Sequence, residues 1–299
     1  GPKKDENMTS AKQTLTALEA NRRYTDLKDA EGQMAQARRD LQRAIAMADA
    51  AGMTPDPAWL DTLGYLESAA GDAEQAVALW QRSLAQRFDP AVALAAATTL
   101  RNLGGTAAAD RLLARIEPQT LSPDDRAQYF SEMAEAAAAA GDPTTARALL
   151  RQALALQPNA DRWFRLGTLL AEARQTEEAL AAYGKAADLS PDNAEIQAAM
   201  GYALVELGRD AAAEEHFARA IALHPDGLDP VYEDSGYVNK RLARNDVAVS
   251  RFKTAIDRIR GSGPEAEATR FRLRREVERL EKSWTATANV TVNSLQAAA

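Results

Sequence analysis

A pattern of small, aromatic and proline residues recurs about every 34 residues along this chain and constrains its fold more than any other feature. One copy comprises Gly167, Ala179, Tyr183, Ala186 and Pro191, and the next comprises Gly201, Ala213, Phe217, Ala220 and Pro225. Other copies centre on Gly64, Ala97, Ala134 and Gly236. A fixed period of this length is typical of units that bury their apolar faces only by stacking on neighbours. The sequence therefore predicts six stacked units between residues 57 and 260.

Each part of the pattern has a physical role in a pair of helices. Glycine and alanine let two helix backbones cross closely, while the aromatic side chain fills the space before the next unit. Proline ends the second helix because it lacks an N–H group and clashes with the preceding turn. The chain is also rich in alanine and only 6% aromatic, which favours closely packed helices over β structure.

The pattern resembles a known repeat family. Its residues Trp163, Leu166, Gly167, Ala179, Tyr183, Ala186 and Pro191 match the tetratricopeptide repeat, a helix-turn-helix unit. The resemblance covers residues 57–260 and implies an all-α fold. It also implies a right-handed superhelix, or α-solenoid, of about six to seven helix pairs with a C-terminal capping helix.

Composition shifts divide the rest of the chain. We interpret residues 1–8 as a protease-cleavage remnant with a disordered tail, 9–55 as a degenerate N-terminal helix pair, 56–260 as the repeat array, and 264–282 as the capping helix. Thr and Val alternate from Trp284 to Ser294, which predicts a β-strand. Residues 283–299 are therefore expected to be a strand-like or disordered tail that starts a truncated β-barrel domain.

The first helices of such units line the concave side of the array, which makes their inward residues candidates for binding. A residue that directly follows the close-packed glycine is turned toward this groove, and it is tyrosine at positions 65, 202 and 237. The same geometry turns Asp61 and Glu135 inward. The candidate groove residues are Tyr65, Asp161, Phe164, Tyr202, Glu206, Glu233, Tyr237, Lys240 and Arg241. An aromatic and acidic groove can stack on sugars or hold a peptide, although the tyrosines can also serve only to pack adjacent units.

The composition excludes several other functions. A chain without cysteine and with two histidines has no disulfide, thiolate zinc site, cysteine nucleophile or three-histidine metal site. With 36 basic and 43 acidic residues, the net charge of −7 argues against nucleic-acid binding. The apolar runs fall short of the roughly 18 residues that a membrane-spanning helix needs. We therefore predict no enzymatic activity, no metal and no cofactor.

A narrower resemblance concerns residues 234–257 together with the charged helix and Trp-led segment that follow. This junction resembles outer-membrane exopolysaccharide-export proteins of the phage-adsorption protein A type. The resemblance implies a non-catalytic periplasmic scaffold attached to the outer membrane through a missing barrel. Its expected partners are proteins of a secretion or envelope complex, or the exported glycan, with roles in phage adsorption and biofilms.

Two alternatives remain open at this stage. A cytoplasmic adaptor for peptide binding and complex assembly would use the same repeats, and so would the regulatory arm of a removed catalytic domain. A leader segment and a barrel in the full-length gene would favour the periplasmic interpretation.

Overall fold

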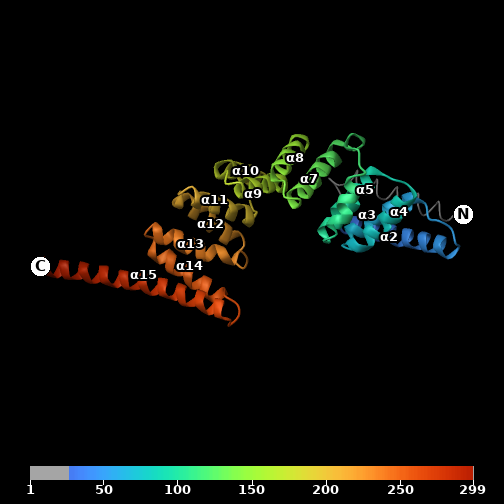
Figure 1. The fold of residues 1–299 in the computed structure, drawn as a ribbon. Helices are drawn as coiled ribbons and strands as arrows, with labels where there is room; N and C mark the ends of the chain where they lie inside the picture. The colour runs from blue at the N-terminus through green and yellow to red at the C-terminus, as the bar shows by residue number, and fades with distance from the viewer. Residues whose placement is uncertain (1–26, 299) are drawn as a thin grey trace. The chain divides into compact units, whose positions relative to one another are not determined.

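A computed structural model describes residues 27–298, and the regular elements in this range are all helices. The chain divides after Gln157 into two compact units. The first unit holds three helix pairs, α3/α4, α5/α6 and α7/α8, with α2 packed on α3. In the second, α9/α10, α11/α12 and α13/α14 are followed by α15, which packs on α14 (Figure 1). The prediction of an all-α array of six helix pairs ended by a capping helix is confirmed.

The helices of the first unit are α2 (Leu27–Ala50), α3 (Pro57–Ala69), α4 (Ala73–Gln86), α5 (Pro90–Asn102), α6 (Thr106–Leu113), α7 (Pro123–Ala139) and α8 (Pro143–Leu156), with a 3₁₀ turn, η1 (Pro118–Thr120), before α7. Those of the second unit are α9 (Ala160–Glu172), α10 (Thr176–Leu189), α11 (Ala194–Glu206), α12 (Asp210–Leu223), α13 (Asp229–Arg241), α14 (Asn245–Arg258) and α15 (Pro264–Ala297).

Side-chain caps fix where many of these helices begin. Asp56 accepts a hydrogen bond from the backbone N–H of Ala58, and Asn159 accepts one from that of Arg162, at 2.8 Å each. Such bonds satisfy donors that the first turn leaves without an intrahelical partner. Proline occupies the first turn of α3, α5, α7, α8, α13 and α15, where its missing N–H costs nothing.

The repeated small and aromatic residues form the cores of the pairs. Phe217 and Phe252 are completely buried, and Trp80 is 2% exposed. The alanines one turn before and after Phe217, at 213 and 220, are also completely buried. The pattern therefore marks the contact between the two helices of each pair.

The capping helix buries one apolar face against the last pair. Leu273, Val277 and Leu280 lie in one cluster with Phe252 of α14. Phe271 lies outside this cluster and is 62% exposed, with the Arg275 guanidinium 5.7 Å from its ring centroid. The apolar stripe that packs on α14 therefore contains Leu273, Val277 and Leu280 but not Phe271.

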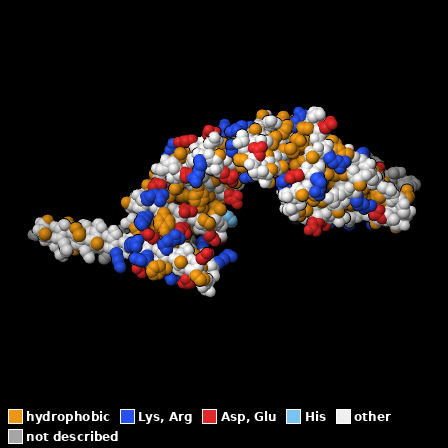
Figure 2. Space-filling model, in the orientation of Figure 1, with side chains coloured by type: hydrophobic (Ala, Val, Ile, Leu, Met, Phe, Trp, Pro, Cys, Tyr) orange, Lys and Arg blue, Asp and Glu red, His pale blue; other side chains and the backbone are white. Residues whose placement is uncertain are grey.

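The prediction of a strand between Trp284 and Ser294 is wrong, because α15 continues to Ala297. Hydroxyl groups in this stretch donate to carbonyls one turn back: Thr287 to Ser283 at 2.9 Å, and Thr291 to Thr287 at 3.0 Å. These bonds satisfy the Thr hydroxyl groups within the helix. Adding a residue to an existing helix also costs less than starting a new one, because each residue that is ordered gains one backbone hydrogen bond. Figure 2 shows this end of α15 as a surface without charged side chains.

The prediction for the N-terminal region is only partly covered by the structure. Of the helix pair expected within residues 9–55, the part before residue 27 lies outside the described residues, as does the whole of segment 1–8. The second helix of this pair corresponds to α2, whose Leu41 and Ile45 are buried in one cluster with Leu60 and Leu63 of α3. No helix between residues 27 and 298 is both long enough and apolar enough to cross a membrane.

Candidate ligand-binding groove

In four of the six helix pairs, α3/α4, α9/α10, α11/α12 and α13/α14, the glycine of the pattern touches the aromatic side chain of the second helix. A Cβ atom at Gly201 would lie 2.5 Å from Cε1 of Phe217, and one at Gly236 would lie 2.5 Å from Cε1 of Phe252. These distances leave no room for any side chain. Glycine is thus required for the aromatic ring to pack directly on the first helix.

Tyrosine follows three of these glycines, at positions 64, 201 and 236, and each tyrosine rests on the aromatic ring that its glycine touches. Tyr65 lies edge-to-face on Trp80, with centroids 5.2 Å apart, and Tyr202 and Tyr237 lie similarly on Phe217 and Phe252 at 5.0 Å. Such pairs stabilise beyond the area they bury. Tyr65 is nevertheless 39% exposed and Tyr202 38%, whereas Tyr237 is half-buried. The first two rings therefore pack and also keep part of their surface exposed to solvent.

Tyr65 stands among carboxylates of the first unit. Burial raises its pKa to about 12, and the negative charges of Asp89, Asp61 and Asp125 act in the same direction. Asp61 accepts a hydrogen bond from the Ser83 hydroxyl and pairs with an Arg87 guanidinium nitrogen at 3.2 Å. Burial raises the pKa of Asp61, while these two partners act against the rise. The surroundings of Tyr65 favour a positively charged group.

Tyr202 has a similar environment in the second unit. Burial raises its pKa, and the Asp234 carboxylate of α13 raises it further. Glu206, one turn along α11, accepts hydrogen bonds from Arg174 at 2.7 Å and from the Thr176 hydroxyl at 3.2 Å. To bind a ligand as predicted, the Glu206 carboxylate would have to give up these hydrogen bonds to the preceding helix pair.

The last helix pair differs, because its predicted groove residues are paired within the protein. Glu233 and Lys240 bond to side chains of α15, at 2.6 Å from Arg272 and Glu276 respectively. Arg241 makes two bonds to Asp210, at 2.8 and 3.1 Å. Burial raises the pKa of Tyr237; Arg272 and Lys240 oppose this rise, while the carboxylates of Glu276 and Glu233 add to it. The capping helix thus supplies charges to this part of the groove.

The remaining candidates have separate positions. Phe164 is half-buried and packs on Tyr183, with ring centroids 5.5 Å apart. Asp161 is exposed in the first turn of α9, and Glu135 is half-buried on α7. Of the nine candidate groove residues, Tyr65 belongs to the first unit and the other eight to the second.

Sequence reasoning missed charged residues beside the candidate tyrosines: Asp89 and Asp125 beside Tyr65, Asp234 beside Tyr202, and Arg272 and Glu276 beside Tyr237. Asp89 caps the helix after its pair, which the Asp-Pro step before α5 signals. Asp234 directly follows Glu233, so its acidic character was visible in the sequence. The two residues of α15 lie outside the repeat pattern and carried no such signal.

The histidines and the acidic side chains are groups among the described residues that could hold a metal ion or transfer a proton. Among them, no group of three or more His, Asp or Glu side chains is arranged to hold a metal ion. His216 donates from Nδ1 to Oε1 of Gln197 at 2.8 Å, and burial lowers its pKa. This bond ties His216 to a neighbouring helix.

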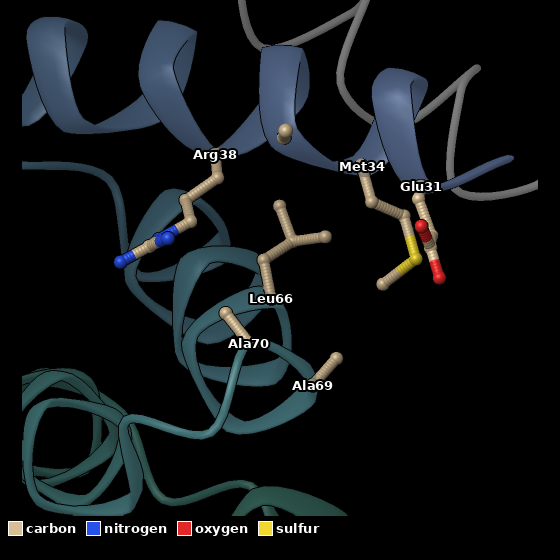
Figure 3. A pocket seen from close by; sticks show the side chains of 7 residues that line it. Glu31, Met34, Arg38, Leu66, Ala69 and Ala70 are labelled. Atoms are coloured by element: carbon tan, nitrogen blue, oxygen red, sulfur yellow. The ribbon is translucent and has the colours of Figure 1, made fainter. Parts of the chain in front are cut away.

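A hollow of about 250 Å³ lies apart from these residues, between α2 and the end of α3. Figure 3 shows Met34 and Leu66 pointing toward each other across it. Arg38 lines it as well, but its guanidinium is paired with buried Glu67 at 2.9 Å. The lining residues thus join α2 to α3.

Comparison with known proteins identifies the repeats. Family models described as TPR repeat and tetratricopeptide repeat match residues 167–208 and 194–226. The chain thus carries tetratricopeptide repeats, as the resemblance implied. It is 29% identical over 221 residues to Bacteriophage adsorption protein A of Escherichia coli (strain K12). The matched residues make up 72% of this chain and 22% of that protein. The chain therefore matches less than a quarter of this relative's length.

Solved structures agree on the fold. The chain is similar to pilF of Pseudomonas aeruginosa, with a TM-score of 0.59 and 17% identity over 75% of this chain and 95% of that one. A tetratricopeptide repeat protein from Parabacteroides merdae gives a TM-score of 0.56 and 13% identity, over 94% of this chain and all of that one (100%). These structures support the fold alone. The family models and the relative support a protein-binding tetratricopeptide-repeat protein, a class whose members are typically non-catalytic scaffolds.

Proposed function

We propose that this chain is a non-catalytic scaffold of a bacterial envelope protein and that it binds a basic segment of a protein partner. The observation that carries this proposal is the environment of Tyr65 and Tyr202. Both rings keep more than a third of their surface exposed, and both stand beside carboxylates. A tyrosine face attracts a Lys or Arg side chain, and the carboxylates add an opposite charge.

The charge of the whole chain supports the same choice. Its net charge of −7 attracts basic partners and increases their rate of association. An exported glycan that carries amino groups has similar chemistry, so it is the alternative ligand in the binding experiment. Neutral glycans would stack on the rings without using the carboxylates.

Binding of a lysine-rich peptide tests the groove. In calorimetry at low salt, we expect Tyr65→Ala and Tyr202→Ala each to weaken binding by about 3- to 10-fold, since each removes one cation–π contact. Tyr237→Ala is the matched control: it follows the same kind of glycine and packs on the same kind of ring, but the carboxylates beside it, Glu233 and Glu276, are paired with Arg272 and Lys240. An equal loss in all three variants would show that the tyrosines serve only for packing.

A periplasmic location is the second part of the proposal. The named relative acts in bacteriophage adsorption, a process at the cell surface, which supports an envelope protein. In cells that express the full-length gene, we expect protease to cleave this segment once the outer membrane is permeabilised. Cleavage only after the inner membrane is also broken would favour the cytoplasmic adaptor instead.

A further inference from the structure

A second hollow lies in the second unit, among α10, α11 and α12, and shares no residue with the candidate groove. Its volume is about 390 Å³, within the range of pockets that bind small ligands. Four of the lining residues have polar side chains, and the others are small or apolar. The polar residues are Asp188, Gln197, His216 and Arg219, and the others are Gly184, Ala187, Pro191 and Met200. Figure 1 shows the three helices side by side.

The neighbouring helix pairs have an aromatic ring at the position where this hollow opens. Four residues before the close-packed glycine, α9 has Trp163 and α13 has Tyr232, whereas α11 has Gln197. Tyr232 is only 5% exposed, and its hydroxyl donates to the carbonyl of Pro225 at 2.6 Å. Pro191, the equivalent of Pro225 in the preceding unit, lines the hollow.

A cation accompanies the ring in these neighbours. The Lys185 ammonium lies 5.8 Å from the Trp163 centroid, and the Arg258 guanidinium lies 4.7 Å from that of Tyr232. Arg219 is one 34-residue period after Lys185, as Gln197 is one period after Trp163. The α11/α12 pair thus keeps the cation of its neighbour, but within the described chain no ring lies beneath Arg219.

Gln197 cannot fill the space that a ring would occupy. It is 2% exposed, and its Oε1 is held by His216 Nδ1 at 2.8 Å, which turns the amide toward α12. Met200 and the small residues of α10 line the rest. A methionine sulfur and a guanidinium both interact favourably with aromatic rings, and the Asp188 carboxylate can accept a bond from an indole N–H or a phenol.

We propose that this hollow is a docking site for an aromatic side chain, Trp or Tyr, that a partner protein inserts between α10 and α12. The inserted ring takes the position that Trp163 and Tyr232 occupy in the adjacent pairs. Arg219 covers its face, and Met200 contacts its edge. This proposal is independent of the proposed basic ligand, because the docking site shares no residue with the candidate groove.

N-acetyl-tryptophanamide, titrated into the whole chain, tests this proposal. We expect NMR shifts of the Met200 methyl group and the His216 ring that saturate with a dissociation constant on the order of 1 mM. Arg219→Ala should weaken binding by about two- to fivefold, the loss of one exposed cation–π contact. Lys185→Ala is the matched control and should leave binding unchanged, because Lys185 already covers Trp163.

A further variant, Gln197→Trp, should abolish binding by supplying the ring from the chain itself. If this variant does not fold, the proposal is still tested by comparing how tightly the Arg219→Ala and Lys185→Ala variants bind the tryptophan probe. The proposal is overturned if Met200 and His216 do not shift, if N-acetyl-leucinamide binds as tightly as the tryptophan probe, or if the two cation variants behave alike.

Discussion

Phe217→Ala is expected to lower the free energy of unfolding of the α11–α13 region by about 3–5 kcal/mol. Phe217 is completely buried, and its ring packs against the backbone at Gly201 and lies edge-to-face with the Tyr202 ring. Its removal loses this burial and leaves a cavity between two helix pairs. Because a repeat array is stabilised mainly by contacts between neighbours, the loss should be local.

Amide hydrogen exchange measures this effect segment by segment, which a single unfolding transition of a repeat protein does not. We expect faster exchange in α11, α12 and α13, with the amides of α3 unchanged. Equal acceleration in both units would contradict a local role for Phe217.

Two glycine substitutions, which add a side chain where Phe217→Ala removes one, serve as a control. Gly201→Ala should destabilise the same region by about 1–3 kcal/mol, since its Cβ would overlap the Phe217 ring. Gly184 lies within helix α10, and a Cβ there would have no atom within 4 Å. Gly184→Ala should therefore stabilise by about 0.5–1 kcal/mol. Opposite signs for the two changes would establish that contact with the ring, and not helix preference, requires Gly201.

The repeat cores could be predicted from the sequence because their physical requirement recurs. At Gly201 the chain needs a residue without a side chain, and 16 residues later it needs the ring that occupies the space; the same requirement holds at Gly236 and Phe252. Since each pair solves the same packing problem, the period itself revealed the fold. The tail offered no second copy for comparison. Alternating Thr and Val fits a strand, but Thr287 and Thr291 fit equally well into a helix already begun at Pro264.

The candidate groove could be predicted only in part, because some of its charged residues lie outside the repeat period. The position after each glycine identified Tyr65 and Tyr202, whose rings are exposed beside carboxylates. The pairing of Glu233 and Lys240 depends on Arg272 and Glu276, which lie on a helix outside the period. No rule based on the repeat could place those two side chains. By contrast, the absence of an aromatic at Gln197 was visible as soon as the copies were aligned with Trp163.

A buried polar cluster joins the last two helix pairs and leads to the second large effect. Glu214 of α12, 6% exposed, accepts a hydrogen bond from the Ser235 hydroxyl at 2.7 Å and pairs with Arg251 at 3.4 Å. Arg251 also donates from Nε to Ser235 at 3.2 Å, and Asn239 donates to the Ser235 carbonyl at 2.8 Å. The cluster therefore connects α12, α13 and α14 through one carboxylate.

Glu214→Ala should destabilise this region by about 2–4 kcal/mol, because it leaves a largely buried guanidinium without its counter-charge. The expected loss is below that of a fully buried pair, since the Arg251 side chain keeps 21% of its surface exposed. Exchange rates of the α12–α14 amides would report the change. Glu177→Ala is the matched control: its pair with Arg209 also links consecutive helix pairs, but those side chains are 61% and 50% exposed. Its effect should stay within about 1 kcal/mol.

Adding Arg251→Met to Glu214→Ala separates the two causes of the loss. If the cost arises from an unpaired buried charge, the double variant should recover part of the stability that the single variant loses, because an apolar side chain of similar length needs no partner. If the cost arises from the bonds to Ser235, the second change should destabilise the region further, since it also removes the Nε donor. Recovery would show that Glu214 is retained to neutralise Arg251; additional loss would assign the stability to the hydrogen bonds centred on Ser235.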